Sequence, residues 1–165
     1  MSAKDKQTKV KSKPTSAIKI IQDNKSVRHE YHIIETFEAG LVLVGSEVKA
    51  IRDHSIQLKD SYIAFKGHEA FLQNAHISEY KSSSYNNHQP ERLRKILLHK
   101  AELQQIYDAL REKGLTCVAS KIYFKNGRVK LEIALVKGKK LHDKREAIKK
   151  RDIDKQLKQT KQFSR

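Results

Sequence analysis

Cysteine and long apolar runs are nearly absent from this 165-residue chain. The single cysteine, Cys117, excludes an intramolecular disulfide, and no Cys-x-x-Cys pair is present to hold zinc or to act as a redox pair. No run of eighteen apolar residues occurs, and the lysine-rich start is not followed by the apolar segment of a signal peptide. We therefore expect a soluble protein of a reducing, cytoplasmic compartment, with no metal, no other cofactor and no membrane partner.

Residue patterns typical of catalytic sites are also missing. The chain has eight histidines, but His29 and His32 are three apart, a spacing that directs their side chains to opposite faces of a strand. Gly138-Lys139-Lys140 has neither the earlier glycine nor the following Ser or Thr of a phosphate-binding P-loop. We predict that the protein is not an enzyme. The alternative from another class is a small ribonuclease that uses His29 or His142, because RNA cleavage needs two acid–base groups beside a phosphate.

Positive charge is what the sequence has in excess. Its 35 Lys and Arg against 19 Asp and Glu give a net charge of +16, and most of the surplus lies at the two ends. Residues 1–25 carry seven basic against two acidic side chains, and residues 137–165 carry twelve against four. This composition is typical of a folded module that attaches to nucleic acid through basic arms and a localised patch. We expect a flexible arm over residues 1–23, a folded domain over 24–136 and a basic tail over 137–165.

The basic tail has too few apolar side chains to fold by itself. Its large apolar residues do not share one helical face and cannot bury enough surface to offset the entropy of ordering the segment. Glu146 with Lys150, and Asp154 with Lys158, are i, i+4 pairs, but each such pair stabilises a helix by only ~0.2–0.5 kcal/mol. We predict a tail that is disordered when free and helical only when bound to a polyanionic partner.

The central part of the sequence has the alternation and turn residues of short antiparallel strands. Asn126-Gly127 is the strongest turn signal, because both residues tolerate the positive φ angles of a type I′ turn. The expected elements are strands at 28–37 and 41–44 joined tightly at Gly40, a helix at 46–52 with Ser46 as N-cap, a hairpin at 61–77 about Gly67-His68, an exposed loop at 81–90, a strand at 92–98, a helix at 100–113 ended by Gly114, and a hairpin at 117–138.

About six strands and one full helix predict a mainly β fold with peripheral helices. A closed antiparallel barrel is favoured because closure hides the strand edges, and an oligonucleotide-binding-like (OB-like) barrel suits a small basic domain. Most aromatic side chains should lie in its core. The basic residues that the strand and helix patterns turn outward are Arg28, Lys49, Arg52, Lys121, Lys125, Arg128 and Lys130.

Several separated motifs, from about Asn24 to Arg145, resemble the SsrA-binding protein (SmpB) family. They are Asn24-Lys25 with Arg28-His29-Glu30-Tyr31; Phe37-Glu38-Ala39-Gly40; Gly45-Ser46-Glu47-Val48-Lys49; Leu58-Lys59-Asp60-Ser61-Tyr62; Arg94-Lys95 with Leu97-Leu98; Tyr123-Phe124-Lys125-Asn126-Gly127-Arg128; and Lys137-Gly138-Lys139-Lys140 with His142-Asp143-Lys144-Arg145. The sequence departs from the family at Asp53-His54-Ser55, where the family often has a small glycine-containing turn followed by lysine.

The resemblance implies an RNA-binding adaptor for trans-translation. Such a protein binds the tRNA-like domain of transfer-messenger RNA (tmRNA) and delivers this RNA to stalled ribosomes, while its tail acts in the decoding region and the message channel. We expect a monomer when free; a general ribosome-associated barrel without a dedicated RNA partner is the remaining alternative. By motif position, the family's RNA contacts correspond to Asn24, Lys25, His29, Glu38, Arg52, Leu97, Lys130 and Lys140, and its ribosome-acting tail motif corresponds to Gly138, His142, Asp143, Lys144 and Arg145.

Overall fold

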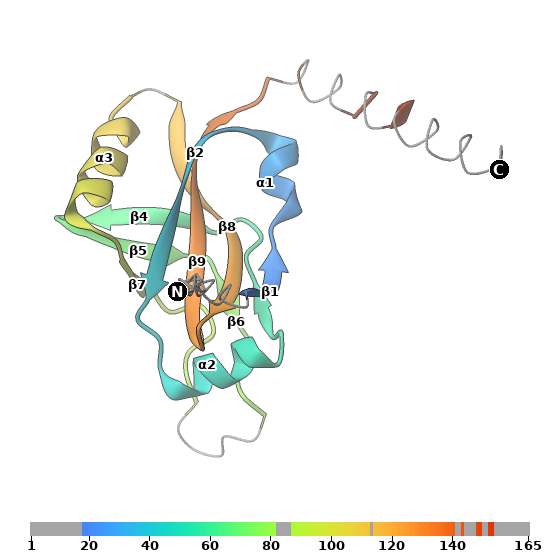
Figure 1. Ribbon diagram of the computed structural model, residues 1–165, viewed down its shortest axis with the longest axis vertical. Coiled ribbons are helices and arrows are strands. Elements are labelled where there is room, and N and C mark those ends of the chain that lie inside the picture. The colour runs from blue at the N-terminus through green and yellow to red at the C-terminus, as the bar shows by residue number, and fades with distance from the viewer. Residues whose placement is uncertain are drawn as a thin grey trace, which may run out of the picture.

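Nine strands and three helices make up the described part of the chain (Figure 1). The computed structural model describes residues 18–81, 87–112, 114–140, 143, 148–149 and 152–153. The elements are β1 (Ile18–Asp23), α1 (Lys25–Glu30), β2 (Tyr31–Leu41), α2 (Gly45–Arg52), β3 (Ile56–Gln57), β4 (Tyr62–Lys66), β5 (Glu69–Gln73), β6 (His76–Ile77), β7 (Arg94–Leu97), α3 (Lys100–Leu110), β8 (Leu115–Lys125) and β9 (Arg128–Gly138).

The main sheet closes on itself. Its strand order is β1-β8-β4-β5-β7-β2-β9, and β9 also pairs with β8, so β8, β4, β5, β7, β2 and β9 form a ring. Strand β1 lies outside this ring along β8, and β3 pairs with β6 in a separate two-stranded sheet. Every pairing is antiparallel. The mainly β class with few helices, expected from the sequence, is therefore confirmed.

The β8–β9 hairpin provides much of the core, as its sequence predicted. Asn126 and Gly127 form the turn with φ angles of 52° and 74°, which are those of a type I′ turn. On β9, Leu131 and Ile133 are fully buried and Leu135 nearly so. Burying each such aliphatic side chain stabilises the fold by roughly 1.5–3 kcal/mol. The long pairing of β9 with β2 then joins this hairpin to the N-terminal half of the chain.

The segment around Gly40 folds differently from the prediction. Residues 31–41 form one continuous strand, β2, in place of two strands joined at Gly40. Gly40 pairs with Lys130 on one side and Leu97 on the other, so it lies inside the sheet and makes no turn. Residues 25–30 form helix α1, where a strand was expected. A six-residue helix with Val27 as its one buried residue is too short to show a helical period in the sequence.

The sheet also extends beyond the boundaries expected for the folded domain. Strand β1 lies within the range assigned to the flexible arm, and β9 continues to Gly138, inside the range assigned to the tail. Strand β1 pairs with β8 and buries Ile21. Because it contributes only this one side chain to the core, its hydrogen bonds to β8 hold it in the sheet. The expected second hairpin is shorter than predicted, because β5 ends at Gln73 and His76-Ile77 pair with β3.

A buried ion pair fastens α2 to β7. Glu47 and Arg94 are both fully buried, with Arg94 Nε donating to Glu47 Oε1 at 2.8 Å. Arg92 donates to both carboxylate oxygens at 2.8 and 2.6 Å, and the N–H of Val44 donates to Oε2 at 2.9 Å. Ser46, the predicted N-cap, instead lies 2.9 Å from Nδ1 of the buried His88. The N-cap position is Val44. Its backbone N–H has no partner within the helix and donates instead to the Glu47 carboxylate.

Two absences hold for the described residues. No group of three or more histidine, cysteine or acidic side chains there is arranged to hold a metal ion. None of the described helices is long and apolar enough to cross a membrane.

Cys117 is fully buried, and burial raises the pKa of its thiol to about 12, which keeps the sulfur protonated and unreactive at neutral pH.

Candidate nucleic-acid interface

One row of cross-strand partners runs across the outer face of five strands. Tyr123 of β8 pairs with Ile20 of β1 and with Lys130 of β9. Lys130 pairs in turn with Gly40 of β2, and Gly40 pairs with Leu97 of β7. Directly opposed residues on paired strands direct their side chains to the same face. We call these five residues the outer row.

Glu38 joins three donors beside the outer row. Its Oε2 accepts hydrogen bonds from Tyr123 Oη at 2.6 Å and Lys125 Nζ at 2.8 Å, and its Oε1 lies 3.5 Å from Lys130 Nζ. The hydrogen bonds from Lys125 and Tyr123 lower the pKa of Glu38 to about 2. The carboxylate is therefore ionised at neutral pH and fixes the position of both lysines on a surface that is open to solvent.

A second carboxylate lies directly opposite Glu38 on β9. Glu132 and Glu38 are cross-strand partners. Burial opposes ionisation of Glu132, but hydrogen bonds from Ser120 and Lys121 outweigh it and lower the pKa of Glu132. Lys121 Nζ lies 3.1 Å from Glu132 Oε1, and the charge of Arg28 on α1 acts in the same direction. Two adjacent carboxylates are thus neutralised by a surrounding set of basic side chains.

A groove opens at the Leu97 end of the outer row. Its volume is about 530 Å³. Its walls combine apolar side chains with charged groups that include Glu38 and Lys130. The lining residues are Glu38, Gly40, Leu41, Leu43, Val48, Leu97, Leu98, His99, Glu102, Gly127, Arg128, Val129 and Lys130. Leu97 is 51 % exposed although it belongs to a sheet strand. An apolar groove with a few charged groups at its rim suits a flat, partly polar ligand such as a nucleobase.

Comparison with known proteins decides the family. The SmpB protein family model matches residues 21–163. An SsrA-binding protein of Bdellovibrio bacteriovorus is 66 % identical over 148 residues, which cover 90 % of this chain and 97 % of that protein. The chain belongs to the SmpB family. An SsrA-binding protein of Persephonella marina is 51 % identical over 140 residues, covering 85 % of this chain and 92 % of the relative.

A solved structure is similar as well. One of its chains, from work described as "tmRNA-SmpB: a journey to the center of the bacterial ribosome", aligns with a TM-score of 0.64 and 41 % identity. The alignment covers 77 % of this chain and 93 % of that chain. Most of the folded part of this SmpB family member therefore has a structural counterpart.

Six of the eight RNA contacts carried over from the family fall into two groups in the fold. Glu38, Leu97 and Lys130 line the groove together, although they come from three different strands. Arg52, on α2, lies apart from them, with its guanidinium carbon 6.0 Å from the centre of the Phe124 ring. Phe124 alternates with Tyr123 along β8 and so faces the opposite side of the strand.

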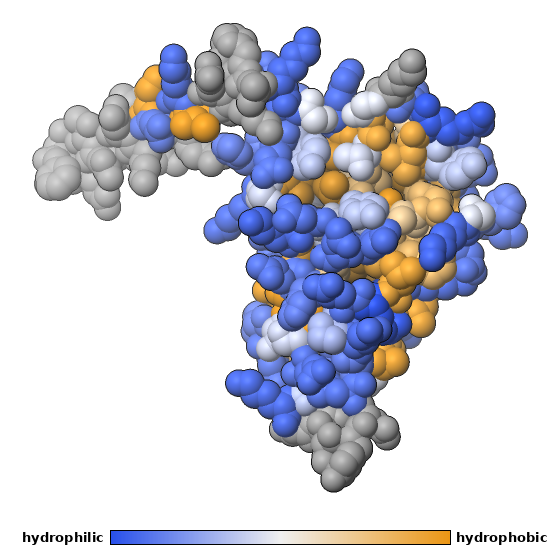
Figure 2. Space-filling model, turned by 180° about the vertical axis from the view of Figure 1, so that it is seen from behind, coloured by the Kyte–Doolittle hydropathy of each residue, from blue (hydrophilic) through white to orange (hydrophobic). Residues whose placement is uncertain are grey.

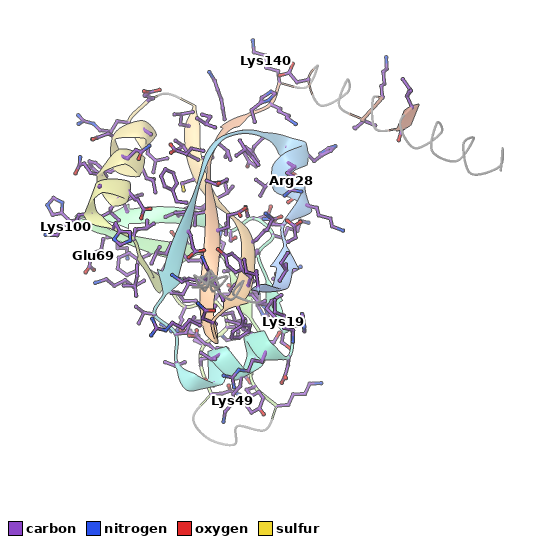
Figure 3. All side chains as sticks on the ribbon, viewed as in Figure 1. Lys19, Arg28, Lys49, Glu69, Lys100 and Lys140 are labelled. Carbon is purple, nitrogen blue, oxygen red and sulfur yellow. The ribbon has the colours of Figure 1, made fainter. Side chains whose placement is uncertain are left out.

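The second group lies where α1 meets the end of β9. Lys25 is exposed and His29 half-buried on α1, and Lys140 is exposed after β9. Backbone and side chain of Lys139 connect the two elements by donating to the carbonyl oxygens of Glu30, at 3.0 Å, and Arg28, at 2.9 Å. Figure 3 shows Arg28 and Lys140 at the same end of the molecule and Lys49 at the other.

The tail motif is described only in part. Gly138 is the last residue of β9 and pairs with Tyr31. An Asp143 carboxylate oxygen lies 3.4 Å from His32 Nε2 and accepts a hydrogen bond from the N–H of Lys140 at 3.3 Å. His142, Lys144 and Arg145 lie outside the described residues, and so does the tail conformation that the sequence predicted.

Asn24 has its polar groups engaged inside the protein. Its Nδ2 donates to the carbonyl oxygens of Leu58 at 2.9 Å and Ala119 at 3.1 Å, and its Oδ1 accepts from the hydroxyl of Ser26 at 2.6 Å. Both amide hydrogens are therefore used within the fold. These contacts hold the start of α1 against the sheet, and the RNA contact implied for Asn24 stays a prediction.

The departure from the family at Asp53-His54-Ser55 has a structural explanation. His54 has a φ angle of 59°, the left-handed conformation that glycine adopts most easily. Its ring Nδ1 lies 3.1 Å from the carbonyl oxygen of Ile21 and donates to it, because a carbonyl can only accept. The hydrogen bond to β1 offsets part of the backbone strain, so the side chain at this left-handed position also fastens β1.

Acid is expected to weaken the fold through Glu38. Its folded pKa of about 2 lies below the ordinary value of 4.5, so its ion pairs contribute stability above pH ~4.5 that is lost as the pH falls towards 2. Urea unfolding measured between pH 7 and 2 should show a smaller loss of stability for Glu38→Gln than for the unchanged chain. Glu112→Gln, at an exposed position after α3, controls for the removal of one surface carboxylate. Parallel pH curves for Glu38→Gln and the unchanged chain would contradict the expectation.

Proposed function

We propose that this chain is an RNA-binding adaptor that binds the tRNA-like domain of tmRNA and brings it to stalled ribosomes. The observation that carries the proposal is the meeting of Glu38, Leu97 and Lys130 at one groove on a basic outer face. Phosphate groups would bind the lysines and arginines around the groove, and an unpaired base would enter it. The names of the relatives and of the similar solved structure point to the same RNA and to the ribosome.

The ring of six strands supports a finer description of the fold in the same proposal. We assign it as a closed OB-like barrel, since β8–β9 pairing removes the free edges of the ring. A rigid closed barrel suits recognition of the shape of a folded RNA, because its surface groups need no ordering on binding. In this assignment the folded domain binds RNA, the tail over residues 137–165 acts on the ribosome in the cytoplasm, and no step is catalytic.

A binding titration tests the RNA partner. Fluorescently labelled tRNA-like domain should bind tightly, with an affinity that falls steeply as the salt concentration rises. Unrelated tRNA serves as competitor: equal competition would favour a general ribosome-associated protein. Labelled RNA recovered after incubation should be intact, and specific cleavage products would favour the ribonuclease alternative. Absence of binding at low salt would overturn the proposal.

A truncation separates the two roles. A chain that ends before His142 keeps the groove and the outer row, which lie within residues 20–130. We expect its affinity for the tRNA-like domain to change less than about threefold, while peptide tagging on ribosomes stalled without a stop codon is lost. The full chain is the control in both assays. A large loss of RNA affinity on truncation would show that the tail contributes to RNA binding.

A further inference from the structure

Two isoleucines of β1 are exposed at the end of the outer row opposite Leu97. Ile18 and Ile20 are each 55 % exposed. Their cross-strand partners on β8 are Lys125 and Tyr123, the two residues that donate to Glu38. The isoleucine side chains therefore lie on the same face of the sheet as the candidate interface, on a strand that the sequence placed in the flexible arm.

The two ends of the outer row are chemically alike, because each presents an exposed aliphatic side chain. Ile20 at one end is 55 % exposed and Leu97 at the other is 51 % exposed, whereas Tyr123 between them is 8 % exposed. Four strand-to-strand intervals separate the ends, which corresponds to about 19 Å measured along the sheet. Lys130 lies at the centre, and Lys125 and Arg128 form the next pair of the β8–β9 register on the same face. Two aliphatic contacts flank a cationic centre.

Strand β1 is held firmly enough to present these side chains. Besides its pairing with β8, the carbonyl of Ile21 accepts the hydrogen bond from His54. The chain that follows β1 is fixed by Asn24, whose backbone N–H donates to Ser120 at 2.7 Å and whose amide reaches Leu58 and Ala119. Contacts made by a pre-positioned strand cost little conformational entropy on binding.

The charges around β1 identify the occupant. Arg128 is exposed and Lys125 half-buried beside the isoleucines, on the same face of the sheet. A protein segment or lipid tail would meet an apolar patch too small to bury much area, surrounded by cations. RNA combines phosphates for the cations with ribose and base surfaces for the aliphatic side chains. Basic charge complementarity and continuity with the groove therefore favour RNA.

We propose that Ile18 and Ile20 form a second aliphatic contact for the bound RNA, packing against an unpaired base or its ribose while Lys125 and Arg128 bind the flanking phosphates. This inference rests on the proposed function, because it extends the same interface from Leu97 across to β1. It assigns an RNA-contacting role to a strand outside the ring, and to residues that the family motifs do not include.

Two variants test the contact: the single change Ile20→Ser, and the double change Ile18→Ser with Ile20→Ser. The matched control is Ile34→Ser, because Ile34 is 54 % exposed on β2 and is not part of the outer row. In titrations with the tRNA-like domain, Ile20→Ser should bind about five- to tenfold more weakly and the double variant weaker still, whereas Ile34→Ser should bind as the unchanged chain does. Ile20→Val should retain most of the affinity, since it keeps an aliphatic surface.

The salt dependence distinguishes this contact from a loss of charge or of folding. The slope of log affinity against log salt should be the same for Ile20→Ser and the unchanged chain, but smaller for Lys130→Ala, because only the lysine change removes a phosphate contact. Unfolding midpoints of Ile20→Ser and Ile34→Ser should agree. Equal affinities of Ile20→Ser and the unchanged chain, with RNA binding intact, would overturn this inference and leave the proposed function standing.

Two other outcomes would also overturn it. If the unchanged chain does not bind the tRNA-like domain, the proposed function falls and the inference falls with it. If sedimentation shows a dimer of the unchanged chain that Ile20→Ser dissociates, the isoleucines belong to an interface between two copies. Otherwise the aliphatic end of the outer row is assigned to RNA.

Discussion

Glu47→Ala is expected to lower the free energy of unfolding by about 3–5 kcal/mol, the largest effect of any single change considered for this fold. Burial opposes ionisation of Glu47, but hydrogen bonds from Arg92, Val44 and Arg94 outweigh it and hold its pKa below the ordinary value. Without the carboxylate, the buried Arg94 keeps its charge with no counterion. Urea unfolding followed by circular dichroism measures the loss.

The matched control is an exposed ion pair in the same protein. Glu69 pairs with Lys95, and their side chains are 49 % and 43 % exposed. Glu69→Ala should therefore change stability by less than about 1 kcal/mol. Replacing Glu47 and Arg94 together with methionine should cost less than Glu47→Ala alone, because no fully buried charge is left without a counterion, and Arg92, the other partner of Glu47, is 29 % exposed. Similar losses for Glu47→Ala and Glu69→Ala would show that the buried pair has no special weight.

Lys130→Glu is expected to weaken binding of the tRNA-like domain about a hundredfold at moderate salt. The change removes the cation at the centre of the outer row and puts a third carboxylate beside Glu38 and Glu132. The new carboxylate then repels the RNA phosphates at the position where the Lys130 ammonium would attract them. The slope of log affinity against log salt should fall by about one or more.

Lys66→Glu provides the control for this charge reversal. Lys66 is exposed at the end of β4, which β8 separates from β9 in the ring, and it is not part of the outer row. The substitution changes the net charge by the same amount, so it measures the long-range effect of charge alone. A loss of less than about threefold is expected. Equal losses for the two variants would mean that overall charge, and no local contact, governs RNA binding.

Local signals made part of the fold predictable. The β8–β9 hairpin follows from Asn126-Gly127 and the alternation on either side, because the turn type depends only on those two residues. Helix α3 begins as expected, with the N–H of His99 bonded to Glu102 at 3.1 Å. The β4–β5 turn at Gly67 has a φ angle of 59°. In each case neighbouring residues determine the conformation.

Long-range contacts made other parts unpredictable. Strand β1 has one buried side chain, Ile21, and exists because β8 offers it a partner. The continuity of β2 through Gly40 depends on Lys130 and Leu97, which are far away in the sequence. The burial of Glu47 with Arg94 left no local pattern, since an acidic residue in the first turn of a helix is usually exposed.

The candidate site was likewise predictable where local signals determine it and unpredictable where long-range contacts do. The basic outward positions of Lys125, Arg128 and Lys130 follow from strand alternation alone. Their meeting with Glu38 and Leu97 was implied only by resemblance to the family, because the register of β2 on β9 brings them together. Asn24, which the resemblance placed at the RNA, has its amide bonded within the protein.

The closure of β2 on β9 also makes the outer row an all-or-none property of the chain during synthesis. The outer row draws on β1 and β2 near the N-terminus and on β8 and β9 near the C-terminus. A nascent chain cannot assemble this row until β9 has left the ribosome, and contacts of such long sequence separation form late in folding. An incomplete copy of the protein would thus expose an open sheet edge and lack the outer row and the groove at its end.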